Sequence, residues 1–196
     1  MIDRHLITLA VALQHLDDDV PTLQAWGQAA ASAMAAGGRL FACGAGASAQ
    51  QARHLVAELT DSQDDRPPLP AGTLELDMEP LSARTERGPG EAADVREAII
   101  GRVRIDFRPG DVLLCLSATT ADEQVAAAAA AAGEAGIQPW ALTGPRPNTV
   151  AAACGEAVCV DAVAISTIEE VHLAAIHIFG AAVNSAVRDT IRAEHR

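Results

Sequence analysis

The chain has 196 residues, of which 49% are hydrophobic and 20% charged, so it can bury a full core and is expected to form one domain. Its fourteen basic residues are all arginine, and against 26 acidic residues they leave a net charge of −12, which disfavours direct binding to a nucleic-acid backbone. Four cysteines without a CxxC pair indicate neither a disulfide framework nor a cysteine zinc site. A reducing, cytoplasmic location is therefore expected.

Two helices are predicted at the N-terminus. Apolar residues recur at helical spacing over 6–16, and a second helical pattern begins at Pro21, a residue that suits the first turn of a helix. We expect a helical hairpin over residues 1–36 and an α/β core over residues 37–196, within one domain. The N-terminal apolar stretch is short and is followed by aspartates, so no signal peptide and no membrane span are expected.

The rest of the chain alternates strands and helices. Strands are predicted at residues 40–43, near 74–76, and at 112–116, 139–142 and 157–160. Helices are predicted at residues 49–59, 91–104, 122–135, 148–154 and 167–193. Such alternation predicts a three-layer α/β/α sandwich with a parallel sheet of about five strands.

Two loops are placed to bind a ligand, because ligands of parallel α/β sheets bind outside the carboxyl ends of the strands. The first loop, residues 43–48, offers Gly46 for close backbone approach and the Ser48 hydroxyl at the start of a helix. The glycine pattern alone is also compatible with an ordinary tight turn.

The second loop, residues 116–122, gathers the hydroxyls of Ser117, Thr119 and Thr120 ahead of another helix. This setting suits the oxygens of a phosphate or a sugar. A polar turn in which Asp122 caps the helix explains the same residues, so the pattern leaves both interpretations open.

Two helices carry candidate acid, base or metal-binding side chains. His54 and Glu58 stand four residues apart, about 40° around a helix axis, so both can face one site or simply stabilise their helix. On the closing helix, Glu170 lies about 20° from His177 and Glu169 about 80° away, which favours Glu170 as its partner. A capping box at the start of that helix explains the glutamates equally well.

Three segments together resemble the sugar isomerase (SIS) domain, and most closely its phosphoheptose isomerase branch. They read FACGAGASAQQARHLVAEL, VLLCLSATTADEQVAAAAAAAGEAGIQPWALTG and STIEEVHLAAIHI, and with the flanking helices they cover nearly the whole chain in order. The resemblance implies a flavodoxin-like SIS fold and a homotetramer with sites built between subunits. It also implies a cytoplasmic ketose/aldose isomerase of carbohydrate metabolism that acts on sedoheptulose 7-phosphate.

The resemblance also assigns roles. Glu58 and His177 match the pair that transfers protons through an enediol. Some members hold zinc with the residues that match His54, Glu58, Glu169 and His177, so zinc is the implied cofactor, and this match favours Glu169 over Glu170. The third of these positions is normally a glutamine, so the carboxylate here would leave the site closer to neutral and less able to polarise a carbonyl.

The two loops depart from the family. The first reads close to CGNGGSA in the family, and here alanine replaces the asparagine and one glycine. The second reads STSGNS, and here its last serine is Asp122. Like charges about 4 Å apart cost roughly 1 kcal/mol in water and about 4 kcal/mol at an effective dielectric of 20, so Asp122 should oppose a phosphate. The substrate-binding residues implied by both loops are Gly46, Ser48, Ser117, Thr119, Thr120 and Asp122.

Three functions remain open at this point. The retained Glu58 and His177 favour a phosphosugar isomerase. The altered phosphate loop favours a SIS-fold binding or regulatory protein that has lost turnover, or a related enzyme with a different substrate. The family's asparagine-aspartate loop after the second strand has no clear counterpart in residues 78–95, which removes further expected substrate contacts.

Overall fold

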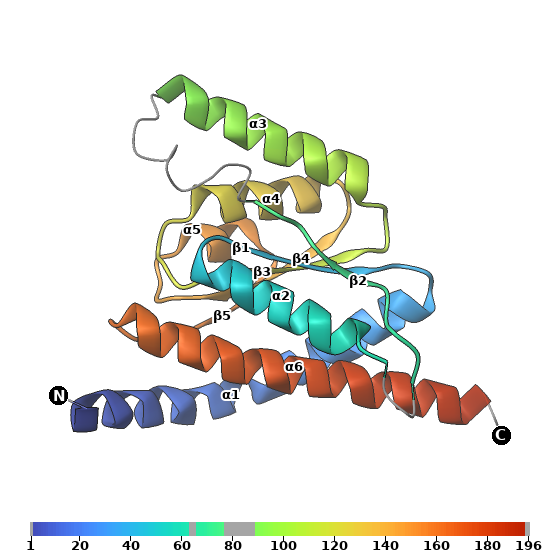
Figure 1. Cartoon of the computed structure of the whole chain (residues 1–196), viewed down its shortest axis with the longest axis horizontal. Helices are drawn as coiled ribbons and strands as arrows, with labels where there is room; N and C mark the ends of the chain where they lie inside the picture. The colour runs from blue at the N-terminus through green and yellow to red at the C-terminus, as the bar shows by residue number, and fades with distance from the viewer. Residues whose placement is uncertain (1, 63–65, 77–88, 195–196) are drawn as a thin grey trace.

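The structure is a computed structural model that describes residues 2–62, 66–76 and 89–194. A five-stranded parallel sheet with strand order β2-β1-β3-β4-β5 lies between two layers of helices (Figure 1). The strands are β1 (Leu40–Gly44), β2 (Ala71–Thr73), β3 (Val112–Ser117), β4 (Gln138–Thr143) and β5 (Glu156–Cys159). The helices are α1 (Ile2–Ala35), α2 (Ala47–Thr60), α3 (Pro89–Asp106), α4 (Glu123–Glu134), α5 (Thr149–Ala153) and α6 (Ile165–Glu194). The predicted α/β/α sandwich is confirmed.

The central strand shows why the sheet is covered on both faces. All six residues of β3 are buried. Alternate side chains of a strand point to opposite faces, so Leu114 and Leu116 pack with α1, α2 and α6, whereas Leu113 and Cys115 pack with α3 and α4. Figure 1 shows these two helical layers on opposite sides of the sheet.

The predicted N-terminal hairpin is wrong, because α1 is one continuous helix with Pro21 inside it. A proline within a helix costs about 3 kcal/mol. Leu16, Leu23 and Trp26, on both sides of the proline, are nevertheless all buried in the same core. Each such burial contributes roughly 1.5–3 kcal/mol, and together they exceed the cost of the proline.

The second strand lies three residues earlier than predicted. It spans Ala71–Thr73 and pairs with β1, while Leu74 and Leu76, whose apolar character suggested the strand, are buried just after it. The amide of Leu74 still donates to the carbonyl of Ala42 in β1. The segment without a family counterpart lies largely outside the described residues.

Helix α6 is long and carries much of the core. Within the described residues it is the one helix whose length and hydropathy would allow it to cross a membrane. A helix in the core of a folded domain has the same properties, and α6 packs along α1 and against α2, with Phe179 and Val183 fully buried. Packing within the domain therefore accounts for part of its apolar composition, since 39% of that apolar window is buried.

Candidate functional site

The two predicted loops leave neighbouring strands at the same edge of the sheet. Gly44 at the end of β1 pairs in register with Leu116 of β3. The loops that follow these strands therefore start side by side and lead into α2 and α4.

The first loop depends on glycine at two positions. Gly46 has a φ of 58°, a conformation that L side chains rarely adopt. At Gly44, a Cβ atom would lie 2.7 Å from the main chain of Ser48, so only glycine permits this turn. Ser48 itself is buried, which leaves backbone amides of the loop as the groups nearest to solvent.

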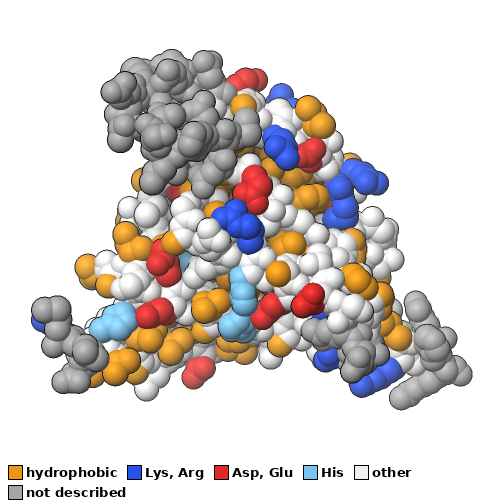
Figure 2. Space-filling model, in the orientation of Figure 1, with side chains coloured by type: hydrophobic (Ala, Val, Ile, Leu, Met, Phe, Trp, Pro, Cys, Tyr) orange, Lys and Arg blue, Asp and Glu red, His pale blue; other side chains and the backbone are white. Residues whose placement is uncertain are grey.

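His54, Glu58 and His177 form a cluster of ligand atoms that all lie within 4.8 Å of one another. The two histidine Nε2 atoms are 3.1 Å apart. Glu58 Oε1 lies 3.4 Å from Nε2 of His54 and 3.5 Å from Nε2 of His177. Figure 2 shows histidine and acidic side chains gathered on the face formed by α2 and α6.

Helix geometry explains this cluster. His54 and Glu58 are one turn apart on α2, and α6, which packs against α2, supplies His177. Gly180 lies one turn further along α6, and a Cβ atom there would be 3.6 Å from Glu58 Oε2. The side chains of the cluster are 38–50% exposed, so a ligand can reach them directly.

Neither candidate glutamate of α6 belongs to the cluster. Glu170 pairs with His5 of α1 at 3.0 Å. Glu169 precedes His177 by eight residues, which is about 12 Å along a helix, and its carbonyl accepts from Gln51. Of the four residues predicted to converge on one pocket, His54, Glu58 and His177 therefore meet within this chain, whereas Glu169 lies apart from them in it.

The spacing of the three ligand atoms fits a zinc ion. Bonds of about 2.0–2.1 Å in a tetrahedral arrangement place neighbouring ligand atoms about 3.3 Å apart, close to the 3.1–3.5 Å found here. Two imidazole nitrogens and one carboxylate are also a usual donor set for zinc, and three protein ligands leave one position open for a substrate oxygen.

The second loop is closed by its own hydrogen bonds. Ser117 is buried, and its hydroxyl lies 3.2 Å from Oγ1 of Thr119 and donates to Asp122 Oδ2 at 3.4 Å. Asp122 Oδ1 accepts from the amide of Val125 at 3.2 Å and so caps α4, while its own amide donates to Thr149. The predicted cap is confirmed, and Thr119 and Thr120 remain exposed.

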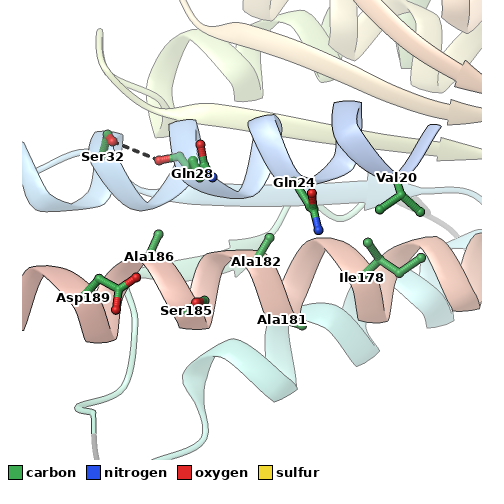
Figure 3. A pocket seen from close by; sticks show the side chains of 10 residues that line it. All are labelled: Val20, Gln24, Gln28, Ser32, Ile178, Ala181, Ala182, Ser185, Ala186 and Asp189. Atoms are coloured by element: carbon green, nitrogen blue, oxygen red, sulfur yellow. Dashed lines mark hydrogen bonds between the residues drawn. The ribbon is translucent and has the colours of Figure 1, made fainter. Parts of the chain in front are cut away.

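One hollow adjoins the cluster, and a second lies next to the first. One has a volume of about 450 Å³ and is lined by Glu58, His177 and Asn184 among others. The second, of about 790 Å³, runs between α1 and α6 and shares Ala181 with the first (Figure 3). Small side chains of α6 face this second hollow, and no residue of the cluster lines it.

Two sets of hydrogen bonds near the site were not predicted from the sequence. Arg66 is buried and bonds both Asn184 and main-chain carbonyls of α2. Asn148 and Thr149, which follow β4, bond the second loop. Their only sequence signals, an arginine between loop residues and an asparagine before a short helix, are too common to identify a site.

Known proteins resemble this chain over most of its length. Residues 9–144 match the SIS domain family. The phosphoheptose isomerase of Streptomyces coelicolor is 40% identical over 193 residues, which cover 97% of this chain and 80% of that protein. The phosphoheptose isomerase of Rhodospirillum rubrum is 30% identical over 181 residues, covering 92% and 94%.

Solved structures agree on the fold. The phosphoheptose isomerase from Neisseria gonorrhoeae has a TM-score of 0.76 at 26% identity, covering 94% of this chain and 97% of that one. The phosphoheptose isomerase from Francisella tularensis has a TM-score of 0.78 at 22% identity, covering 94% and 96%.

Proposed function

The chain belongs to the SIS domain family, and from this membership we propose that it is a phosphosugar ketose/aldose isomerase of the phosphoheptose isomerase type. The observation that carries the proposal is the pairing of Glu58 with His177, whose polar atoms lie 3.5 Å apart on two helices beside an accessible hollow. Relatives that bear this name cover almost the whole chain.

The reaction moves one proton between adjacent carbons and one between their oxygens. Glu58 takes the proton from the carbon beside the carbonyl, which forms an enediol, and returns it to the neighbouring carbon. His177 Nε2, when it holds no metal, exchanges protons with the substrate oxygens. Because the two groups lie within 4 Å of each other, one bound sugar can meet both.

Zinc is the proposed cofactor, held by His54, Glu58 and His177. When bound, it would polarise the substrate carbonyl and stabilise the charge that develops on its oxygen. Glu58 Oε1 is the oxygen that faces both histidines, so it would hold the metal, and Oε2 would remain to take the substrate proton.

The two loops are proposed to hold the rest of the sugar phosphate. The first loop offers amides around Gly46, with Ser48 supporting the turn from inside. The second offers the exposed Thr119 and Thr120, while Asp122 occupies its helix amide. We therefore propose weak phosphate binding at the second loop, which is the feature that favours the alternative of a SIS-fold regulatory protein without turnover.

We also propose a homo-oligomer, a homotetramer as the resemblance implies. Leu6, Ile7 and Val11 of α1 and Leu173 of α6 are exposed, and the groove between the two helices is lined by small residues. A second copy that packs there would bury apolar surface and shield the half-exposed cluster from water. A single SIS domain and a cytoplasmic location remain predictions.

The test is turnover of sedoheptulose 7-phosphate by the purified chain, with and without added zinc, followed by separation of the ketose and aldose products. Interconversion that is lost in Glu58→Gln supports the isomerase. Binding of the sugar phosphate by calorimetry without any interconversion would instead support the regulatory alternative.

A further inference from the structure

Arg66 occupies an unusual place between the two helices that carry the acid/base pair. Its side chain is only 3% exposed, and a buried guanidinium is stable only if its donors are satisfied. Nε donates to Oδ1 of Asn184 at 2.6 Å. The two terminal nitrogens donate to main-chain carbonyls, at 3.0 Å to Glu58, 3.0 Å to Leu59 and 3.1 Å to Asp61.

The carbonyls that Arg66 bonds lie at the end of α2. The last carbonyls of a helix lack partners within it, and a cation there also interacts favourably with the helix dipole. Glu58 lies in this last turn, so Arg66 binds the main chain of the residue whose carboxylate faces His177. The guanidinium therefore fixes the end of α2 directly at the proposed base.

The other side of the guanidinium reaches α6. Asn184 follows His177 by seven residues, which is two helical turns and nearly the same helix face. It lines the same hollow as Glu58 and His177. Arg66 thus connects the helix of the proposed base to the helix of its partner through one rigid, planar group.

We infer that Arg66, with Asn184, is a positioning residue that sets the separation of Glu58 and His177. The expected effect on kcat rests on the proposed isomerase function, whereas the hydrogen bonds from Arg66 to both helices are a property of the fold. Proton transfer depends steeply on geometry, and displacement by 1 Å can cost about a hundredfold in rate.

The experiment compares Arg66→Ala, Arg66→Lys and the exposed control Arg102→Ala in the full-length protein. We expect Arg66→Ala to lower kcat by about 10-fold to 100-fold with KM changed less than about threefold, and millimolar guanidinium, but not methylammonium, to restore part of kcat. Arg66→Lys should stay impaired because an ammonium cannot span both helices. Arg102→Ala should match the native protein, because among the described residues Arg102 bonds only Asp106, on its own helix.

Two further variants keep the test decisive if Arg66→Ala does not fold. Asn184→Ala removes the α6 acceptor and should lower kcat, whereas Asn184→Asp keeps an oxygen acceptor and should retain it. Folded Arg66→Ala or Asn184→Ala with native kcat would overturn the inference, as would a loss of thermal stability without any change in kcat.

A readout independent of turnover separates this inference from the proposed function. Calorimetric titration with zinc chloride should show weaker binding by at least about tenfold in Arg66→Ala, because a tetrahedral site needs its ligands correctly spaced. If the native chain turns over no sugar phosphate, the proposed function fails. If the zinc affinity of Arg66→Ala is also unchanged, the inference that Arg66 positions the two helices fails as well.

Discussion

The histidine and glutamate cluster on α2 and α6 and the loop after β3 differ in which polar side chains they expose. Around α2 and α6, His54, Glu58 and His177 are 38–50% exposed and face one another without being enclosed. In the second loop, Ser117 is buried and Asp122 caps its own helix. The first region leaves exposed the groups proposed for proton transfer, whereas in the second Ser117 and Asp122 bond within the loop and only Thr119 and Thr120 stay exposed.

The largest expected effect tests the first region. Glu58→Gln keeps the shape of the side chain and removes the base, so kcat for sedoheptulose 7-phosphate should fall by about 10²–10⁴-fold. Steady-state kinetics measures this, with Glu134→Gln as a matched control, because Glu134 is an exposed glutamate on α4. Equal rates for the two variants would remove Glu58 from the mechanism.

His172 of α6 is a buried histidine that should make the free energy of unfolding depend on pH. Its ring is fully buried, and neither ring nitrogen has a partner with standard hydrogen-bond geometry among the described residues. Burial lowers the pKa of His172 from 6.5 to about 4, although the nearby main chain of Thr143, at the end of β4, opposes the shift. The neutral ring is thus favoured in the folded state.

The sign follows from proton binding. Above pH 6.5 the ring of His172 is neutral in both the folded and the unfolded state. As the pH falls towards 4, the unfolded chain takes up a proton that the folded chain does not. The free energy of unfolding therefore decreases, by about 3 kcal/mol. Urea unfolding of the native chain and His172→Gln at pH 7, 5 and 4 measures the difference. Parallel pH curves for the two proteins would contradict it.

Asp122→Ser tests the second region. Serine is also a good helix cap, so α4 should stay intact while the carboxylate is removed from the loop. Binding of a sugar phosphate should tighten by about 1–3 kcal/mol, the scale of one relieved charge contact and the freed hydrogen bonds. Calorimetry with sedoheptulose 7-phosphate measures this, and the uncharged sugar serves as the control.

The contradicting result for Asp122 is equally specific. If the native chain binds the sugar phosphate tightly and Asp122→Ser binds it no better, the carboxylate does not meet the phosphate. The hydrogen bonds of Asp122 within the second loop would then have no consequence for phosphate binding.

The strand and helix pattern was predictable because it depends on local periodicity. The continuous apolar run of β3, buried on both faces, and the glycines after β1 follow from residues near in sequence. Pro21 led to the wrong prediction of two N-terminal helices, because its effect is decided by Trp26 and Leu23, which pack in a core built from distant segments.

Parts of the site were not predictable for the same reason. His54 and Glu58 share a helix, and their proximity follows from spacing, but the meeting with His177 depends on how α2 packs against α6. The bonds from Arg66 to Asn184 join residues 118 positions apart. No local pattern marks such a pair, because an arginine in a loop has many equally common uses.

The smallest expected effect concerns Glu169. Its contribution to zinc affinity distinguishes a site with three ligands from one chain from a site that another copy completes. His177→Ala removes one of three converging ligands and should abolish calorimetric zinc binding, since each such ligand contributes strongly to affinity. Glu169→Ala should change zinc affinity by less than about threefold, because eight residues of helix place Glu169 about 12 Å along the axis from His177. Glu170→Ala, which breaks only the pair with His5, is the matched control. A tenfold or greater loss in Glu169→Ala, absent from Glu170→Ala, would mean that the carboxylate reaches the metal from a neighbouring subunit.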